Sequence, residues 1–355
     1  MGSRKSFRDL VYSKDWSNFE GYLEKSDKII EQDIKDSVER KRQLKKELLS
    51  DPNFKKRIKT PSKEDLEWAK NELFKSNVCA VDGTISNYNM ATGTRCRIGV
   101  VATSYRNDRV ERVIFISERK FAEESKTAME HFSNLLKDHD MTNILLRAIM
   151  LFEERNIVLQ RDEKWKFVHG PLIPFELRTG RFKKYKDALE VSLELAEELV
   201  EATNVIGVIS STRRLNLLNA GEVLDRFEYM DCGSLIAEWD DYLEKAHFKK
   251  EDEEMMKDFG DKSVSKIKIG LYKVGDKPYV FEAHKDVFDK AAALIIQDSS
   301  YQSLRGFPML IDYADAICSK LLAAGDFRRK IEFKMAKVHP SVLGSEIEET
   351  RTRRR

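Results

Sequence analysis

The order of its apolar segments is the feature that most constrains how this chain can fold. Residues 78–81 form a short apolar run, and residues 95–104 and 109–117 are rich in β-branched side chains on either side of the turn signal Asn107-Asp108. Strand-like and helical segments alternate after this hairpin, which predicts a mixed α/β fold. We expect further strands at 166–168, 205–210, 265–273 and 278–283, and helices at about 120–138, 141–160, 181–203 and 309–323.

A β-hairpin followed by helices, and then by alternating strands and helices, is the element order of ribonuclease-H-like proteins. Such a fold has a mixed central sheet flanked by helices, with acidic residues converging on its strand ends. We expect this α/β fold for a domain at residues 75–325, preceded by a charged helical N-terminal region at residues 1–74. Residues 326–355 are expected to form a C-terminal extension that ends in an arginine-rich tail at 351–355.

The N-terminal region carries one narrow apolar stripe among many charged residues. Its apolar side chains recur at intervals of three or four residues, or multiples of these, which predicts one long helix or two helices. So narrow a stripe must pack against a partner surface, either the main domain or a second subunit. The residues concerned are Trp16, Phe19, Leu23, Ile30, Ile34, Val38, Leu44 and Leu48.

The charge balance and the missing motifs exclude several classes of protein. Lysine and arginine number 63 and aspartate and glutamate 61, so nucleic-acid binding would have to come from local clusters. The sequence contains no GxGxxG, GxxxxGK[ST] or HExxH motif, so Rossmann, P-loop and such metalloprotease assignments have no support. No apolar run reaches the roughly 18–20 residues of a membrane span. Four scattered cysteines without a CxxC pair are typical of a reduced, cytoplasmic protein.

Several carboxylates stand where phosphodiester chemistry would need them. Hydrolysis of a phosphodiester builds negative charge around phosphorus, which divalent cations held by several carboxylates stabilise. Asp82 ends an apolar run and Gly83 is expected to turn the chain away, although this pair alone also fits a simple turn. Asp315 lies in a mostly apolar helix, where an unpaired buried carboxylate would be costly. Glu153 and Glu154 lie on another helix, and each alone fits a solvent-facing surface.

Four short motifs, in one order along residues 75–320, resemble those of the NurA nuclease family. Residues 78–84 (VCAVDGT) look like its opening AVDGS strand, and residues 167–173 (FVHGPLI) are similar to its DGPL strand end. Residues 205–210 (VIGVIS) resemble its GVVK strand, and residues 306–315 look like its closing motif, GYP followed by AD or AH. The N-terminal 60 residues and the tail lie outside this resemblance.

The resemblance implies a ribonuclease-H-like DNA nuclease that depends on manganese or magnesium. It also implies resection of DNA ends, in repair or defence against invading DNA, by a homodimer docked on a hexameric HerA-type ATPase. Asp82 matches the first metal ligand, and Asp315 matches the acidic or histidine ligand of the last motif. Glu153 matches a further ligand, with Glu154 as the neighbouring option. We expect His169 to act as a ligand or a proton-transfer group.

Two positions depart from the family pattern. His169 stands where the family has the aspartate of DGPL, and Ser210 stands where many members have a lysine. Imidazole can ligate a metal but brings no negative charge and favours transition metals. His169 therefore leaves three readings open: an active site with altered metal preference, a degraded site, or a misaligned motif with another acid nearby.

Basic clusters after the Gly170-Pro171 loop and after the 205–210 strand are candidate DNA contacts. Such clusters suit phosphates, although each also fits a solvated surface in a lysine-rich chain. No base-reading motif is visible, so binding is expected to be independent of sequence. The candidate residues are Arg178, Arg181, Lys183, Lys184, Arg213 and Arg214.

Three functions therefore remain open at this point. The first is the metal-dependent nuclease. The alternative is an adaptor of nuclease-like fold that has lost catalysis but binds DNA and the ATPase, a reading motivated by His169 and Ser210. The third is a helical scaffold protein in which Asp82-Gly83 is an incidental turn.

Overall fold

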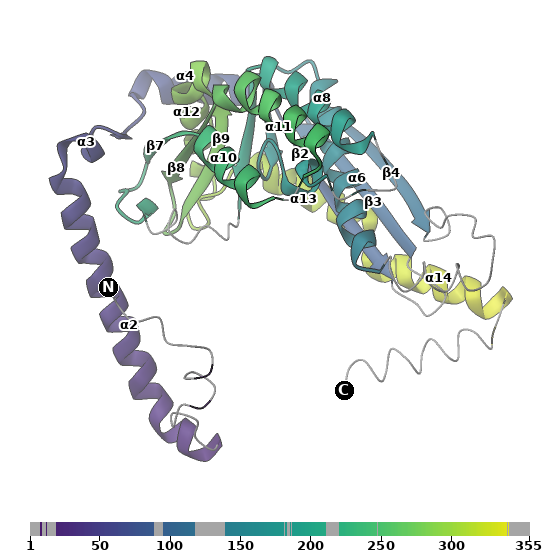
Figure 1. The fold of residues 1–355 in the computed structure, drawn as a ribbon, viewed down its shortest axis with the longest axis horizontal. Coiled ribbons are helices and arrows are strands. Elements are labelled where there is room, and N and C mark those ends of the chain that lie inside the picture. Colours follow the sequence, from purple (N-terminus) through teal and green to yellow (C-terminus); the bar gives the residue numbers. More distant parts are fainter. Residues whose placement is uncertain are drawn as a thin grey trace. The chain divides into compact units, whose positions relative to one another are not determined.

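The protein divides into two compact units, Met1–Lys56 and Arg57–Arg355. The computed structural model describes residues 8, 12, 19–88, 95–117, 139–180, 182, 185, 187–210, 220–246, 248–338 and 340 (Figure 1). The helix expected at about 120–138 and the arginine-rich tail both lie wholly outside the described residues. Within the described part, no helix is long and apolar enough to cross a membrane.

The first unit is a long, highly charged helix with a short one after it. Helix α2 (Phe19–Ser50) spans 32 residues, and α3 (Pro52–Lys55) begins after Asp51, whose carboxylate caps it by accepting from the backbone N–H of Asn53 at 2.8 Å. The part of the expected apolar stripe from Phe19 to Leu48 lies on α2, where Ile30, Ile34 and Val38 are exposed, and Trp16 lies outside the described residues. An isolated helix gains little stability from its own hydrogen bonds, and most helices are stabilised by packing of an apolar face. The exposed stripe on α2 is therefore a candidate contact surface.

The second unit contains one mixed sheet of nine strands among its described residues. The strand order is β1-β7-β8-β9-β6-β5-β2-β3-β4. Strands β2, β3 and β4 form an antiparallel meander, β5 pairs parallel with β2, and β6 pairs parallel with β5. The strands are β1 (Ile58–Lys59), β2 (Val78–Tyr88), β3 (Arg95–Ser104), β4 (Arg109–Ser117), β5 (Trp165–His169), β6 (Val205–Ile209), β7 (Glu228–Ser234), β8 (Ile267–Lys273) and β9 (Pro278–His284).

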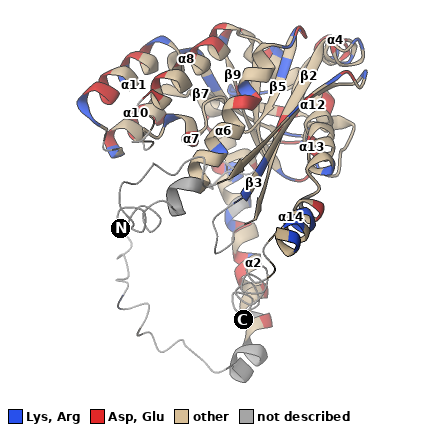
Figure 2. Ribbon diagram, turned by 90° about the vertical axis from the view of Figure 1, so that its right-hand side faces the viewer, with Lys and Arg blue, Asp and Glu red and all other residues tan. Residues whose placement is uncertain are grey.

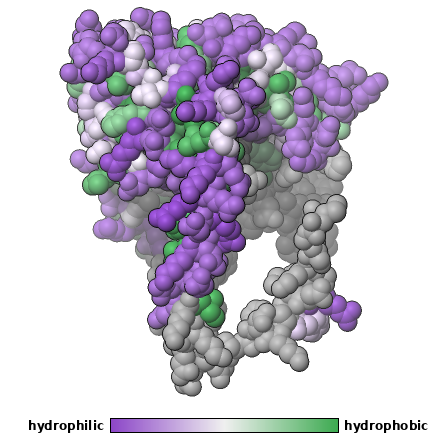
Figure 3. All heavy atoms as spheres, turned by 90° about the vertical axis from the view of Figure 1, so that its left-hand side faces the viewer, coloured by the Kyte–Doolittle hydropathy of each residue, from purple (hydrophilic) through white to green (hydrophobic). Residues whose placement is uncertain are grey.

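Helices cover both faces of this sheet (Figure 2). On one face lie α6 (His139–Leu159), α7 (Phe175–Arg178), α8 (Ala188–Glu201), α10 (Ile236–Lys245) and α11 (Lys250–Lys262). On the other lie α4 (Lys63–Phe74), α12 (Phe288–Ser300) and α13 (Met309–Leu322), and α14 (Ala324–Val338) follows α13. The largest core cluster lies between the central strands and α4, α12 and α13. Charged residues gather on the helices in Figure 2, and hydrophilic side chains dominate the surface in Figure 3.

Two glycines show which helix faces each side of the meander. A Cβ added to Gly83 of β2 would meet Glu154 and Met150 of α6, whereas one added to Gly99 of β3 would meet Leu322 of α13. Side chains alternate along a strand, so Asp82 points to the α13 face and the Gly83 position to the α6 face.

The start of β2 corrects one expectation from the sequence. The strand does not end at Asp82; it continues through Gly83 to Tyr88 and pairs with β3 along its whole described length from Cys79. Gly83 is therefore not a turn residue. Its missing side chain makes room for the carboxylate of Glu154, because a Cβ would lie 2.5 Å from Glu154 Oε1.

Candidate active site

Asp82 lies in the middle of the sheet at the point where its parallel neighbour ends. Val81 pairs with Val168 of β5, and β5 ends one residue later at His169. Asp82 is only 4% exposed, and its Oδ1 lies 2.8 Å from Nδ1 of His169. The end of β5 therefore opens one side of β2 and places an imidazole beside the buried carboxylate.

His169 joins Asp82 to the neighbouring strand. Its Nε2 lies 2.8 Å from Oγ of Ser210, the residue after β6, so both ring nitrogens take part in hydrogen bonds. Burial lowers the pKa of His169, but its hydrogen bond to Asp82 and the nearby carboxylates outweigh burial and raise that pKa above its usual value. The protonated ring can donate to Asp82 and Ser210 at once, so Asp82, His169 and Ser210 form a continuous chain across three strands.

Asp315 approaches Asp82 from α13, but it is exposed and not buried as its apolar neighbours in the sequence indicated, because it lies on the outward side of the helix. Burial raises the pKa of Asp82, His169 opposes this, and the charge of Asp315 together with a hydrogen bond to it raises the pKa further. A cation between the two carboxyls would relieve the repulsion that Asp315 exerts on Asp82. Ser319, one helical turn after Asp315, donates to Asp315 Oδ1 at 3.3 Å. Residues separated by 233 positions thus meet at one point.

Glu154 lies on the opposite face of the sheet, beside Gly83 and within reach of the charge of Asp82. It is 1% exposed, and its Oε2 accepts from Nη1 of the buried Arg155 at 2.7 Å. Burial raises the pKa of Glu154 to about 7; Arg155 opposes this rise, and the charge of Asp82 adds to it. Arg155 also donates to the carbonyls of Pro171 and Leu172, so it ties α6 to the loop that follows His169.

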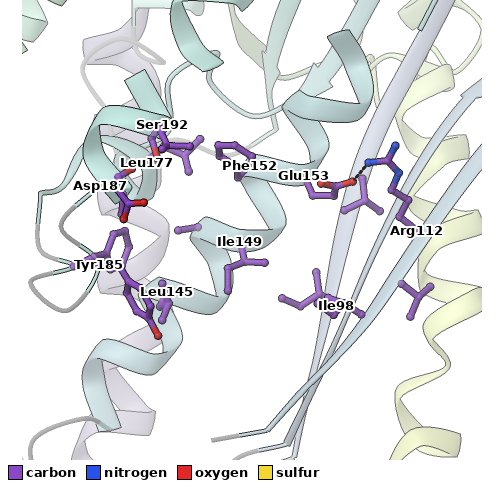
Figure 4. A pocket seen from close by; sticks show the side chains of 17 residues that line it. Ile98, Arg112, Leu145, Ile149, Phe152, Glu153, Leu177, Tyr185, Asp187 and Ser192 are labelled. Carbon is purple, nitrogen blue, oxygen red and sulfur yellow. Dashed lines mark hydrogen bonds and ion pairs between the residues drawn. The ribbon is translucent and has the colours of Figure 1, made fainter. Parts of the chain in front are cut away.

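Glu153 points elsewhere. Its carboxylate forms an ion pair with Arg112 of β4 and accepts from Nδ2 of Asn156 at 3.1 Å. Figure 4 shows this ion pair at the edge of a largely apolar cavity of about 740 Å³ between β3, β4, α6 and α8. The structure therefore brings Asp82, Glu154, His169 and Asp315 together and turns Glu153 away from them.

The candidate DNA contacts are placed only in part. Arg178 ends α7, with its guanidinium 4.6 Å from the ring centre of Tyr242 and 5.3 Å from that of Trp239 on α10. Arg181, Lys183, Lys184, Arg213 and Arg214 lie outside the described residues.

Sequence reasoning did not single out several residues around His169. Phe307 packs edge-on against the His169 ring, at 5.7 Å between ring centres, and Arg305 lies over Phe307 at 5.0 Å. Lys277 Nζ donates to the backbone carbonyl of Ser210 at 3.0 Å. The only sequence signal for Arg305 and Phe307 was their place in and beside the Gly306-Phe307-Pro308 motif, and Lys277 had none.

The donor set can be compared with the needs of a divalent cation. Among the described residues, no group of three or more His, Cys, Asp and Glu side chains stands arranged to hold a metal ion. Asp82 and Asp315 nevertheless fit a hard cation, because they are adjacent carboxyls whose mutual repulsion such an ion would relieve. His169 fits less well, since both of its nitrogens are engaged.

Solved NurA structures share this fold. A crystal structure of NurA aligns with a TM-score of 0.52 at 10% sequence identity, covering 89% of this chain and 99% of that one. The chain has a NurA-like fold. The NurA nuclease from Sulfolobus solfataricus gives a TM-score of 0.47 at 11% identity, covering 76% and 92%, and NurA bound to dAMP and manganese gives 0.49 at 9%, covering 84% and 93%. No protein-family model and no curated protein matches the chain.

These similarities confirm the predicted likeness to NurA structures and the predicted ribonuclease-H-like fold class. The described mixed sheet is flanked by helices on both faces, as the order of sequence segments indicated. The structural alignment supports the fold. Because the sequence identity is only about 10%, the chemistry has to be argued from the residues of this chain.

Proposed function

We propose that this protein is a metal-dependent nuclease that hydrolyses phosphodiester bonds of DNA, most effectively at DNA ends. The observation that carries the proposal is the meeting of Asp82, Glu154, His169 and Asp315, which come from β2, α6, β5 and α13. Asp82 and Glu154 are buried carboxyls with shifted pKa values, His169 is half-buried beside Asp82, and groups of this kind are typical of functional sites.

Asp82 and Asp315 would hold the cation, with Glu154 as a further carboxylate at the same place. When bound, a manganese or magnesium ion would supply positive charge for the phosphodiester oxygens and a more acidic water. His169 positions Asp82 through its Nδ1 hydrogen bond and can hold a proton there. Arg155 fixes the direction of the Glu154 carboxylate, and Ser210 fixes the ring of His169.

The partners in this proposal are DNA, a second copy of the chain and a ring-shaped ATPase of the HerA type. The chain has no nucleotide-binding motif of its own to drive movement along DNA. Helix α2 is our candidate for the contact between copies, because Ile30, Ile34 and Val38 are exposed along it. Acidic residues predominate in the first half of α2 and basic residues in the second, which would favour antiparallel pairing with a second α2.

The second candidate is a nuclease-like adaptor without catalysis. Two observations favour it: both nitrogens of His169 are engaged, and no ready metal-binding group stands among the described residues. Such an adaptor would keep the DNA and ATPase contacts and lose hydrolysis.

Digestion of linear DNA separates the two candidates. We expect the wild-type protein to degrade labelled linear DNA with manganese, and Asp82→Asn and Asp315→Asn to abolish degradation. Asp326→Asn on α14, an exposed aspartate paired with Arg329, is the matched control and should retain activity. Absence of cleavage by the wild type with manganese and the partner ATPase, alongside intact DNA binding, would support the adaptor.

A further inference from the structure

Two loops meet beside His169 and are held together by glycines. The turn between β8 and β9 contains Gly275, and the segment between α12 and α13 contains Gly306, whose φ is +68°. A Cβ on Gly306 would overlap the backbone of Gly275, and one on Gly275 would lie 2.9 Å from the carbonyls of Ser303 and Leu304. The two backbones therefore touch directly, which fixes the loops relative to each other.

Each loop carries one exposed cation next to the candidate site. Lys277, two residues after Gly275, donates to the carbonyl of Ser210 at 3.0 Å, and the hydroxyl of Ser210 bonds to His169. Arg305 precedes Gly306, and its guanidinium lies 5.0 Å from the ring centre of Phe307, which packs against His169. Both cations thus lie one side chain away from His169.

The aromatic rings between these cations make the arrangement rigid. Tyr279 lies 5.2 Å from Phe307 between ring centres, and its hydroxyl donates to the carbonyl of Arg305 at 2.9 Å. Lys277 lies over the Tyr279 ring at 5.0 Å. Both rings are buried, and the charged ends of the two exposed cations lie over them, which fixes where the charges stand.

The neighbouring acids leave both cations able to bind an anion. Arg305 Nη1 pairs with Asp312 at 2.6 Å, but a guanidinium has five N–H donors, so the pair orients it without using all of them. Asp276, next to Lys277, pairs with Arg226 at 2.9 Å. The negative charges of Asp82 and Asp315 repel an approaching phosphate chain. The positive charges of Lys277 and Arg305 nearby would offset this repulsion.

We propose that Lys277 and Arg305 bind the phosphates of a single DNA strand on either side of the bond to be cut. This inference rests on the proposed nuclease function for its biological meaning, because the carboxyl cluster marks the cut. The glycine contact between the two loops holds together the backbones that carry the two cations, so the pair presents fixed positive charges to a sugar-phosphate chain. Neither residue lies near a base-reading motif, and binding is independent of base sequence.

The test is binding of a fluorescent single-stranded oligonucleotide by the full chain in EDTA, where no cleavage occurs. We expect Lys277→Gln and Arg305→Gln each to weaken binding several-fold. Each should also lower the slope of log affinity against log salt concentration by about 0.7, the contribution of one phosphate contact to a single strand. Lys277→Arg keeps the charge and should retain most of the affinity.

Matched controls exclude a general charge effect. Arg109→Gln removes an arginine whose side chain is 47% exposed and paired with Glu111. Arg305 is similar, because its side chain is 51% exposed and paired with Asp312. Lys257→Gln removes an exposed lysine paired with Glu253. Unchanged affinity and salt slope in Lys277→Gln and Arg305→Gln, or equal losses in the controls, would overturn the proposal, as would a wild type that does not bind.

The same measurement separates this inference from the proposed function. Selective loss of binding in the two variants, together with no hydrolysis by the wild type under any metal, would support the phosphate contacts and refute the nuclease. Hydrolysis by the wild type with unchanged oligonucleotide affinity in both variants would support the nuclease and refute these contacts.

Discussion

The Nδ1 atom of His169 lies 2.8 Å from Oδ1 of Asp82, and this contact holds a buried carboxyl against an imidazole whose pKa is raised. The contact can supply positive charge next to Asp82, as a bound cation would. Protonated His169 and a metal ion therefore have overlapping roles.

His169→Asp should make the protein depend on divalent cations for stability. The variant places a further carboxyl beside Asp82 and removes a charged hydrogen bond that contributes about 1.5–3 kcal/mol. We expect a lower melting temperature without metal and a larger rise with manganese or magnesium than in the wild type. If the site is catalytic with His169 as a ligand, the wild type should prefer manganese and the variant should use magnesium better. Equal metal-induced shifts in both proteins would contradict this.

Glu154→Gln and Glu153→Gln should differ strongly in their effects on hydrolysis. Glu154 lies at the carboxyl cluster, whereas Glu153 pairs with Arg112 at the apolar cavity. We expect Glu154→Gln to lower the rate of linear DNA cleavage by about 10–100-fold, as for groups that support a metal site. Glu153→Gln should change the rate little. A larger loss of cleavage rate in Glu153→Gln than in Glu154→Gln would contradict this prediction, because Glu153 would then be the residue that supports hydrolysis.

Gly83→Ala should disturb the site without changing any of its functional groups. The new methyl would lie 2.5 Å from Glu154 Oε1 and 2.7 Å from Met150 Cγ, so the carboxylate must move from its place beside Arg155. Overpacking of this kind costs about 1–3 kcal/mol. Gly325→Ala in α14, where the nearest atom is 3.9 Å from the added Cβ, is the control. Urea denaturation of both variants should show a loss only at position 83.

Asp298→Asn should remove part of the pH dependence of stability. Asp298 is fully buried, accepts from Tyr105 and from the N–H of Leu310, and burial raises its pKa from 3.8 to about 7. A carboxyl whose folded-state pKa is raised binds its proton more tightly in the folded state. Its contribution to the free energy of unfolding is complete below about pH 4 and is lost as the pH rises to about 7. Urea midpoints at pH 5 and 8 should therefore differ less in Asp298→Asn than in the wild type.

Substitution of the stripe on α2 should change the mass of the assembly. Ile30→Glu combined with Ile34→Glu places charges on the exposed apolar stripe, and we expect the sedimentation mass to fall from dimer to monomer. Gln43→Glu is the control, because residue 43 lies on the opposite side of the helix from residue 34. An unchanged dimer in the double variant would place the contact elsewhere.

Local signals in the sequence were sufficient for the meander but not for every element. The turn signal at Asn107 and the β-branched runs around it predicted β3 and β4 with their observed bounds. Helix α12 was missed because it is buried nearly all round, so its apolar residues show no one-sided periodicity. Strand β7 (Glu228–Ser234) mixes polar and small residues around a register shift and gave no clear strand pattern.

The sequence pointed to His169 because it stands at the end of a strand, and to Asp82 because it follows an apolar run, although β2 continues beyond Asp82 to Tyr88. The choice between Glu153 and Glu154 was not, because both are polar and only the packing of α6 on Gly83 distinguishes them. Lys277 and Arg305 come together through the contact of two glycines in separate loops, which no local pattern reveals.

The pairing of β2 with β3 runs without interruption from Cys79 opposite Ser104 to Tyr88 opposite Arg95. A slip of one residue in this ladder would carry Asp82 to the α6 side and bring the empty Gly83 position to the α13 side. Correct strand alignment during folding is therefore a condition for assembling the proposed site, and a chain paired one step out would be compact without it.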